Sequence, residues 1–311
     1  MKGTSLAGGV TGMLLVGGSV GVSKTLVHAP LFTAQAIRYG AAFLLLLAMA
    51  QPAGAAIVRP RGREWCYLAG IAATGLVLFN VGVVRGDAHA EPAVIAVAVA
   101  CVPVLLGVIG PLLEGRAPSR RILLAAAVVT SGCVLVEGGG RTDAAGIAWA
   151  VLTLASESAF TLLAVPVLPR LGAWGVSVHA VWIGAAMFAA LAAVTEGPAA
   201  VTALNAAGWA AVAYLAVLVT AAAFVMWYSA VKALGPGRAG LLTGIAPVSA
   251  ALIGTLTGGG MPGPQVWVGI LVVMAGLAVG LGKTPAFRRL TKRDATADIP
   301  SVRVIRPDGL S

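Results

Sequence analysis

The sequence predicts an all-α integral membrane protein with about ten transmembrane helices, arranged as two inverted five-helix repeats. Three observations predict this fold: an apolar composition, apolar runs of membrane-spanning length and an internal repeat. Of the 311 residues, 59% are hydrophobic and 10% are charged, whereas about 25% of a typical soluble domain is charged. Because a water-exposed surface needs a larger polar share, we expect lipid to surround most of the chain.

Ten apolar segments have the roughly 20 residues that a helix needs to cross a bilayer core of about 30 Å. They are residues 5–24, 31–50, 65–84, 92–112, 121–138, 145–166, 175–195, 207–229, 238–257 and 265–282. The seven Trp residues fall near the predicted helix ends, as interfacial aromatic side chains do. The even number of spans places both termini on one side of the membrane.

The Lys and Arg residues between the spans predict which side that is. One face collects Lys2, Arg59, Arg61, Arg63, Arg116, Arg120, Arg121, Arg170, Lys232 and Arg238, and the opposite face has Arg85 and Arg141. The positive-inside rule makes the richer face cytoplasmic, so both termini are expected in the cytoplasm of a multi-pass plasma-membrane protein. The net charge of +10 is therefore explained by basic loops that orient the chain in the membrane. Nucleic-acid binding is not expected, because the basic residues do not cluster on one folded element.

An internal repeat appears when the chain is shifted by 144 residues against itself. The shift aligns Trp65 with Trp209, Pro92 with Pro236, Pro103 with Pro247, Gly110 with Gly254, Gly115 with Gly259, Pro118 with Pro262 and Gly132 with Gly276. We expect one repeat in residues 1–139, a second in 140–283, and a basic, disordered cytoplasmic tail in 284–311. Five spans per half make the halves inverted, which is a recurrent plan of secondary transporters.

Three stretches resemble the EamA family of the drug/metabolite transporter superfamily: "YLAVLVTAAAFVMWYSAVKALGPGRAGLLTGIAPVSAALIG", "GGSVGVSKTLVHAPLFTAQAIRYGAAFLLL" and "CVPVLLGVIGPLLEG". The resemblance extends over residues 5 to 283. It implies export or uptake of small metabolites, with both termini in the cytoplasm. The chain departs from the family pattern at Gly258, which stands in the repeat register of Glu114 and lacks the usual carboxylate.

Charged side chains within spans are the leading candidates for substrate binding, because burying a charge there costs about 2.5 to 3.5 kcal/mol on insertion scales. Glu157, flanked by Ser156 and Ser158 near the middle of span six, could bind a cationic substrate or a coupling proton, and Ser158 is a further candidate for substrate binding. The alternative is a protonated or serine-bonded Glu that holds helices together. Arg38 could meet an anionic group or pair with Glu157, and otherwise its side chain extends to the outer interface.

Three further residues complete the candidate site. Asn80 in span three could bond a ligand or simply a neighbouring helix. Pro103 and Pro247 each remove a backbone hydrogen bond near the middle of spans four and nine. Because the repeat relates them, they are candidate hinges or cavity-lining residues, with a purely structural kink as the alternative. Trp227 and Tyr228 are expected at the membrane interface, with a cavity-lining position as the second interpretation. Glu114 is expected in a surface ion pair with Arg116.

The sequence therefore predicts a secondary transporter that moves a small metabolite or drug across the plasma membrane by alternating access. Export is favoured, and proton coupling through Glu157 is a hypothesis. The alternative is a channel or another non-carrier membrane protein. A membrane-embedded enzyme is disfavoured because the chain has no HExxH, GxSxG or Asp-rich metal motif. No cofactor or metal is expected; the expected partners are a small-molecule substrate and the lipid bilayer, and homodimer formation is left open.

Overall fold

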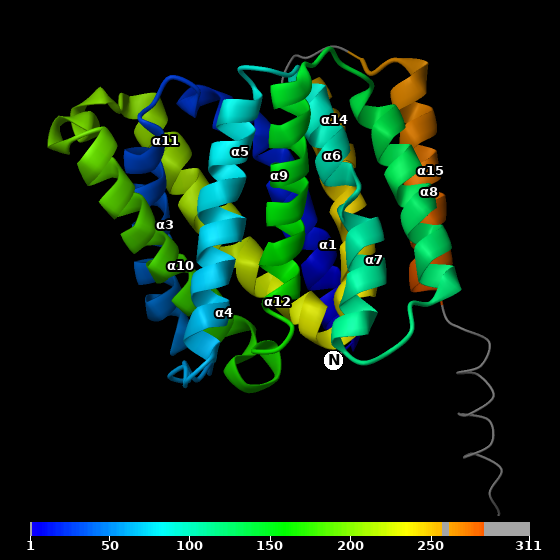
Figure 1. The fold of residues 1–311 in the computed structure, drawn as a ribbon, viewed down its shortest axis with the longest axis horizontal. Helices are drawn as coiled ribbons and strands as arrows, with labels where there is room; N and C mark the ends of the chain where they lie inside the picture. Colours follow the sequence, from blue (N-terminus) through cyan, green and yellow to red (C-terminus); the bar gives the residue numbers. More distant parts are fainter. Residues whose placement is uncertain (1, 257–260, 283–311) are drawn as a thin grey trace, which may run out of the picture. The chain divides into compact units, whose positions relative to one another are not determined.

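The computed structural model describes residues 2–256 and 261–282, and within them the chain is helical (Figure 1). The first half contains α1 (Lys2–Gly18), α2 (Val20–Ser23), η1 (Lys24–Leu26), α3 (Leu31–Ala50), α4 (Glu64–Ile71), η2 (Ala72–Leu78), α5 (Phe79–Gly86), α6 (Pro92–Ala100), α7 (Val102–Leu113) and α8 (Arg120–Glu137). The second contains α9 (Ala144–Leu162), α10 (Leu168–Thr195), η3 (Pro198–Ala203), α11 (Ala206–Tyr214), η4 (Leu215–Ala222), α12 (Ala223–Leu234), α13 (Pro236–Leu241), η5 (Leu242–Gly244), α14 (Ile245–Gly254) and α15 (Pro264–Leu281). Gly258 and the predicted tail 284–311 lie outside the described residues.

Nine helical segments of the described chain are long and apolar enough to cross a membrane, and they coincide with nine predicted spans. The tenth predicted span is α8, an 18-residue helix. Its charged residues, Arg120, Arg121 and Glu137, lie in its first and last turns, where long side chains can reach the polar interface. The predicted all-helical membrane fold is confirmed.

Two helix boundaries differ from the prediction. The span expected at 175–195 begins at Leu168 and contains a break at Gly172, whose φ of 69° suits glycine. The span expected at 145–166 ends at Leu162, because Pro166 disfavours helical backbone in the residue before it. Glu157 therefore lies within two turns of the end of α9 and not at mid-span.

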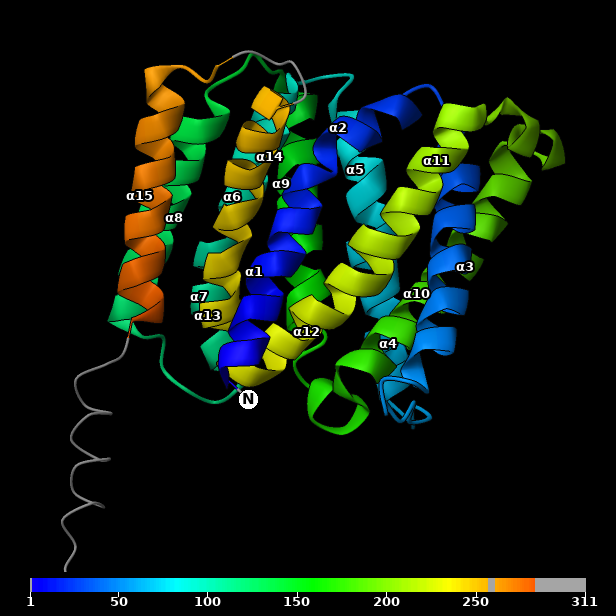
Figure 2. The same cartoon turned by 180° about the vertical axis from the view of Figure 1, so that it is seen from behind.

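Packing between the halves follows the inverted repeat. The 144-residue shift superposes α1 on α9, span three (α4, η2, α5) on span eight (α11, η4, α12), and span four on span nine. Accordingly, α1 packs against α12 and α14, while α9 packs against α5 and α6. Spans that are each other's counterparts also pair directly: α3 with α10, and α8 with α15, which lie side by side in both views (Figures 1 and 2).

The loops after α3, α7, α9 and α12 gather at the end of the helix bundle that holds the N-terminus (Figures 1 and 2). These loops and the adjoining helix starts contain most of the basic residues predicted for the cytoplasmic face. We call this the basic end. Glu114 and Arg116 form the predicted ion pair there.

Spans four and nine show that equivalent helix segments have unequal surroundings. At the basic end α7 packs against α13, and five of the six residues of α13 are buried. Their counterparts at the opposite end, α14 and α6, do not form a comparable contact. In α14 only Ser249 is buried, and in α6 only Ile95 and Ala100. The two spans are therefore packed more closely against each other at the basic end than at the other.

Candidate substrate site

Two π-helical segments interrupt spans three and eight at equivalent positions of the repeat. The segment η2 covers Ala72–Leu78, and the 144-residue shift carries it onto 216–222, which lies within η4 (Leu215–Ala222). Well under 1% of residues in globular proteins are π-helical, and such turns occur frequently at functional sites. The paired segments make the region between spans three and eight a candidate functional region.

A hydrogen-bond network joins the two π-helical segments through Arg38. Its Nε donates to Thr220 Oγ1 (2.9 Å) and its Nη1 to Gln35 Oε1 (3.4 Å). Gln35 Nε2 donates to Asn80 Oδ1 (2.9 Å), and Asn80 Nδ2 donates to the Leu76 carbonyl (2.7 Å). Thr220 in η4 and Leu76 in η2 are counterparts in the repeat, so the network links equivalent positions of the two halves.

Arg38 has only neutral partners among the described residues. Its guanidinium carbon lies 5.1 Å from the centre of the Tyr39 ring, and Tyr39 stacks on Phe188 at 5.5 Å. None of the ion pairs in the described chain joins Arg38 to Glu157, so that predicted pairing is not formed. The positive charge is therefore held inside the bundle without a carboxylate, which suits it to an anionic group of a ligand.

Glu157 lies beside a cluster of aromatic rings from spans six and eight. The ring centre of Phe160 is 5.0 Å from that of Phe224 and 5.1 Å from that of Tyr228, and Tyr228 Oη donates to the Phe160 carbonyl (3.2 Å). The half-buried Glu157 side chain interacts electrostatically with Tyr228. An ammonium group can bind between a carboxylate and the faces of neighbouring aromatic rings.

The serines next to Glu157 do not anchor it. Ser158 is 3% exposed and its hydroxyl has no hydrogen-bond partner among the described residues. No described residue forms an ion pair with Glu157 either. A hydrogen bond from these serines to Glu157 is therefore not seen among the described residues, and a protonated Glu157 that packs between helices stays an alternative to a binding role.

Trp227 and Tyr228 are buried, which corrects their predicted place at the membrane interface. They are 3% and 0% exposed, and Trp227 Nε1 donates to Thr161 Oγ1 of α9 (3.0 Å). The physical reason is that α12 continues to Leu234, so both residues lie deeper from its end than the predicted boundary at 229 implied. They belong to the contact between spans six and eight.

Pro103 and Pro247 lie next to breaks in spans four and nine. Span four is interrupted at Cys101, between α6 and α7, and span nine at η5. A proline cannot donate a backbone hydrogen bond and clashes with the preceding turn. Beside the breaks, the Ala100 carbonyl accepts from Thr130 Oγ1 (2.9 Å) and the Gly244 carbonyl from Cys133 Sγ (3.9 Å). Ala100 and Gly244 are counterparts in the repeat, and both donors belong to α8.

The residues expected from the sequence do not include Gln35, Thr220, or the Phe160 and Phe224 rings that accompany Tyr228. Gln35 lies one helical turn before Arg38, and Thr220 interrupts an otherwise apolar run, so both were detectable as polar residues within spans. The π-helical turns leave no comparable signal, since residues such as Ala, Leu, Val and Gly occur throughout the other apolar spans of the chain.

Comparison with known proteins agrees with this architecture. The model of the EamA-like transporter family matches residues 3–138 and again residues 144–281. An uncharacterized transporter, YetK, of Bacillus subtilis (strain 168) is 25% identical over 249 residues, which cover 78% of this chain and 76% of that protein. A probable terminal-alkyne amino-acid exporter of Streptantibioticus cattleyicolor is 27% identical over 255 residues, covering 81% of this chain and 84% of the exporter.

A solved structure, titled only as the crystal structure of a protein, has the same fold. It superposes with a TM-score of 0.78 at 20% sequence identity and covers 93% of this chain and 99% of that chain. The two matches of the family model together span nearly all of the described residues. The chain therefore belongs to the EamA-like transporter family.

Proposed function

We propose that this protein is a secondary transporter that exports a small metabolite or drug across the plasma membrane by alternating access. The basic end faces the cytoplasm in this proposal, so both termini lie inside. Glu157 carries the coupling proton or meets the cationic group of the solute. The family and the named exporter among its relatives support transport and the direction of export. As a carrier, the protein is assigned no catalytic residue.

The observation that carries the proposal is the unequal packing of spans four and nine. The segments α7 and α13 pack closely against each other at the basic end, while their repeat counterparts α14 and α6 pack less closely at the other end. In an inverted repeat, exchanging the conformations of the halves would close the second pair and open the first. The breaks beside Pro103 and Pro247 lie where each span would bend in that exchange.

The side chains of the site support a solute that carries an ammonium group, a carboxylate or both. Glu157 with the rings of Phe160, Phe224 and Tyr228 suits an ammonium group. Arg38, with neutral partners only, suits a carboxylate. Both sets contact span eight. Amino acids and amines are therefore the first solutes to test, in keeping with the name of the Streptantibioticus relative.

The test is transport by the purified protein in liposomes, with amino acids, amines and small drugs, with and without a pH gradient. We expect gradient-dependent transport of at least one solute, and its loss in Glu157→Gln, which keeps the size of the side chain and removes its charge. Glu137→Gln is the matched control, because Glu137 is also a half-buried helical carboxylate but lies in the last turn of α8. Equal transport by wild type and Glu157→Gln would return Glu157 to a packing role.

Counterflow separates the carrier from a channel. A carrier that binds solute on alternate sides accumulates labelled solute against an excess of unlabelled solute on the other side, whereas a pore does not. We expect counterflow in the wild type. Solute flux without counterflow would favour the channel alternative and would contradict alternating access.

A further inference from the structure

An apolar crevice lies at the basic end, between the neighbouring helices α3 and α10. It has a volume of about 260 Å³ and is lined by Phe43, Leu47, Ile57, Val178, His179 and Trp182. Small-molecule pockets typically begin near 300 Å³, so the crevice suits a slender group. None of the residues assigned above to the candidate substrate site lines it.

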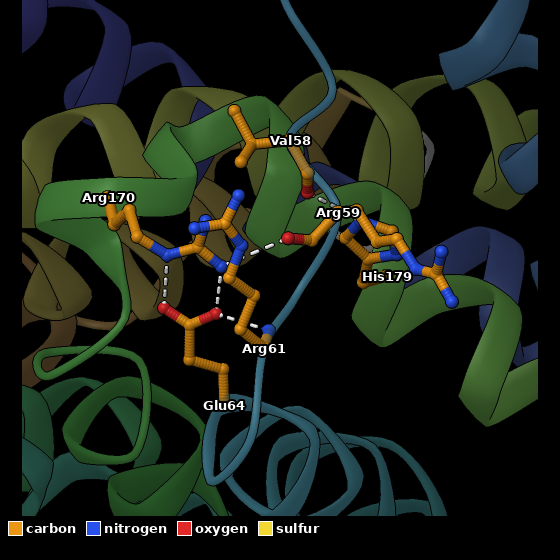
Figure 3. Close-up of polar contacts among 6 residues, drawn as sticks. All are labelled: Val58, Arg59, Arg61, Glu64, Arg170 and His179. Carbon is orange, nitrogen blue, oxygen red and sulfur yellow. Dashed lines mark hydrogen bonds and ion pairs between the residues drawn. The ribbon is translucent and has the colours of Figure 1, made fainter.

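The polar atoms in the wall of the crevice already bond one another. Trp182 Nε1 donates to His179 Nδ1 (3.2 Å), and because indole can only donate, the imidazole proton is on Nε2. His179 Nε2 in turn donates to the Val58 carbonyl (3.1 Å), as Figure 3 shows. With both groups satisfied, the wall offers an arriving ligand carbon surface and no hydrogen-bond partner.

The crevice borders the lipid-facing side of α3. Leu47, which lines it, is 40% exposed, and Leu44, one turn earlier, is 65% exposed. Both views place α3 and α10 at one edge of the helix bundle (Figures 1 and 2). Because α3 is a membrane span, exposed leucines on it meet acyl chains. A hydrocarbon chain is therefore the molecule in immediate reach of this crevice.

The loop that contributes Ile57 carries positive charge at the mouth of the crevice. Arg59, Arg61 and Arg63 are exposed and take part in none of the ion pairs of the described chain. The nearby carboxylate of Glu64 is occupied by Arg170. Figure 3 shows the Arg59 side chain extending past His179, on the side away from Glu64.

We propose that this crevice binds one acyl chain of an anionic phospholipid, whose phosphate is held by the arginines of the loop, Arg59 first. The apolar wall selects the chain, and the positive charge of the exposed arginines selects an anionic headgroup, as basic pockets beside transmembrane helices do. The site does not depend on the proposed transport activity, because lipid binding is measured without a solute.

The test is native mass spectrometry of the detergent-purified protein, titrated with phosphatidylglycerol or phosphatidylcholine of identical acyl chains. A basic residue near a membrane surface contributes about 1 kcal/mol toward an anionic lipid, which is roughly a fivefold change in affinity. We expect phosphatidylglycerol to bind more tightly, and Arg59→Gln to weaken it about fivefold without affecting phosphatidylcholine. Arg85→Gln, an exposed arginine at the opposite end, should leave both affinities unchanged.

The crevice itself is tested by filling it. Leu47→Trp should lower the number of tightly bound phosphatidylglycerol molecules by one, whereas Leu44→Trp, on the same helix but outside the crevice, should not. If Leu47→Trp does not fold, Ile57→Trp fills the same space from the loop. Equal affinity for the two lipids, equal effects of Arg59→Gln and Arg85→Gln, or equal effects of the two leucine variants would each overturn the proposal.

Discussion

Glu196 caps a helix that lies far from it in sequence, and its replacement should weaken the pairing of α3 with α10. The residue preceding α3 is Pro30, which provides no side-chain cap. Instead, the backbone N–H groups of Phe32 and Thr33 donate to the Glu196 carboxylate at 2.9 and 2.8 Å, and Thr33 Oγ1 donates at 2.7 Å. Glu196 directly follows α10. One carboxylate thus accepts hydrogen bonds from the first backbone N–H groups of α3 and connects the start of α3 to the end of α10.

The size of the effect follows from what each substitution removes. Losing a helix N-cap costs about 0.5 to 2 kcal/mol, and losing a negative charge at a helix N-terminus costs about 0.3 to 1 kcal/mol. Glu196→Gln keeps one acceptor oxygen but no charge, so we expect the free energy of unfolding to fall by about 0.5 to 2 kcal/mol. Glu196→Ala removes every acceptor as well as the charge and should cost about 1 to 3 kcal/mol.

The assay is reversible unfolding in mixed micelles, titrated with a denaturing detergent and followed by the helical circular-dichroism signal. Thr195→Ala is the control, because the exposed Thr195 hydroxyl bonds only to Leu191 in its own helix; its effect should stay below about 0.5 kcal/mol, as for other surface substitutions. If Glu196→Ala is also within 0.5 kcal/mol of the wild type, the remote cap contributes nothing and the reasoning from these three hydrogen bonds fails.

Three further predictions concern helix packing, pH and the helix breaks. Gly132→Ala should lower the free energy of unfolding by about 1 to 3 kcal/mol, since the added Cβ would lie 2.7 Å from Val273 N. Gly40→Ala is the control in the same unfolding assay, because its added Cβ would meet open space. Hydrogen bonds from the Gly146 N–H and then from His89 hold the pKa of the Asp143 carboxyl below its ordinary value. The ionised Asp143 therefore stabilises the folded protein at a pH above the ordinary pKa, and this stabilisation is lost as the pH falls through the lowered pKa. Unfolding curves of wild type and Asp143→Ala should differ at pH 6 and converge in acid. Pro103→Ala restores a backbone donor beside the break at Cys101, so we expect slower solute turnover in liposomes with unchanged unfolding, and unchanged turnover would assign Pro103 a purely structural kink.

The sequence predicted the spans well because each is a long apolar run. The prediction was weaker where a single residue determines the end of a helix, as at Pro166 and Gly172. There the apolar run continues past the break, so hydrophobicity alone places the boundary several residues away. The misplaced end of span eight is also why Trp227 was expected at the interface and not against Thr161.

The candidate site was predictable as a set of residues but not as an arrangement. Arg38, Asn80 and Glu157 stand out because polar groups within spans are costly. Which of them bond one another depends on how far each helix is rotated, and one π-helical turn changes that rotation for every residue after it. The partner of Arg38 is consequently Thr220 of the opposite half, a contact that residue type alone does not reveal.

The hydrogen bonds of α8 make the two halves of the chain chemically unequal. Thr130 and Cys133 lie one turn apart, and each donates to the break of a different repeat. The positions that correspond to them in α15 are Met274 and Leu277, whose side chains have no hydrogen to donate. One helix, α8, thus supplies these donors to both breaks, and its counterpart α15 has no donor at the corresponding positions. The halves are therefore not interchangeable: two copies of the second half, joined in tandem, would leave both breaks without these donors.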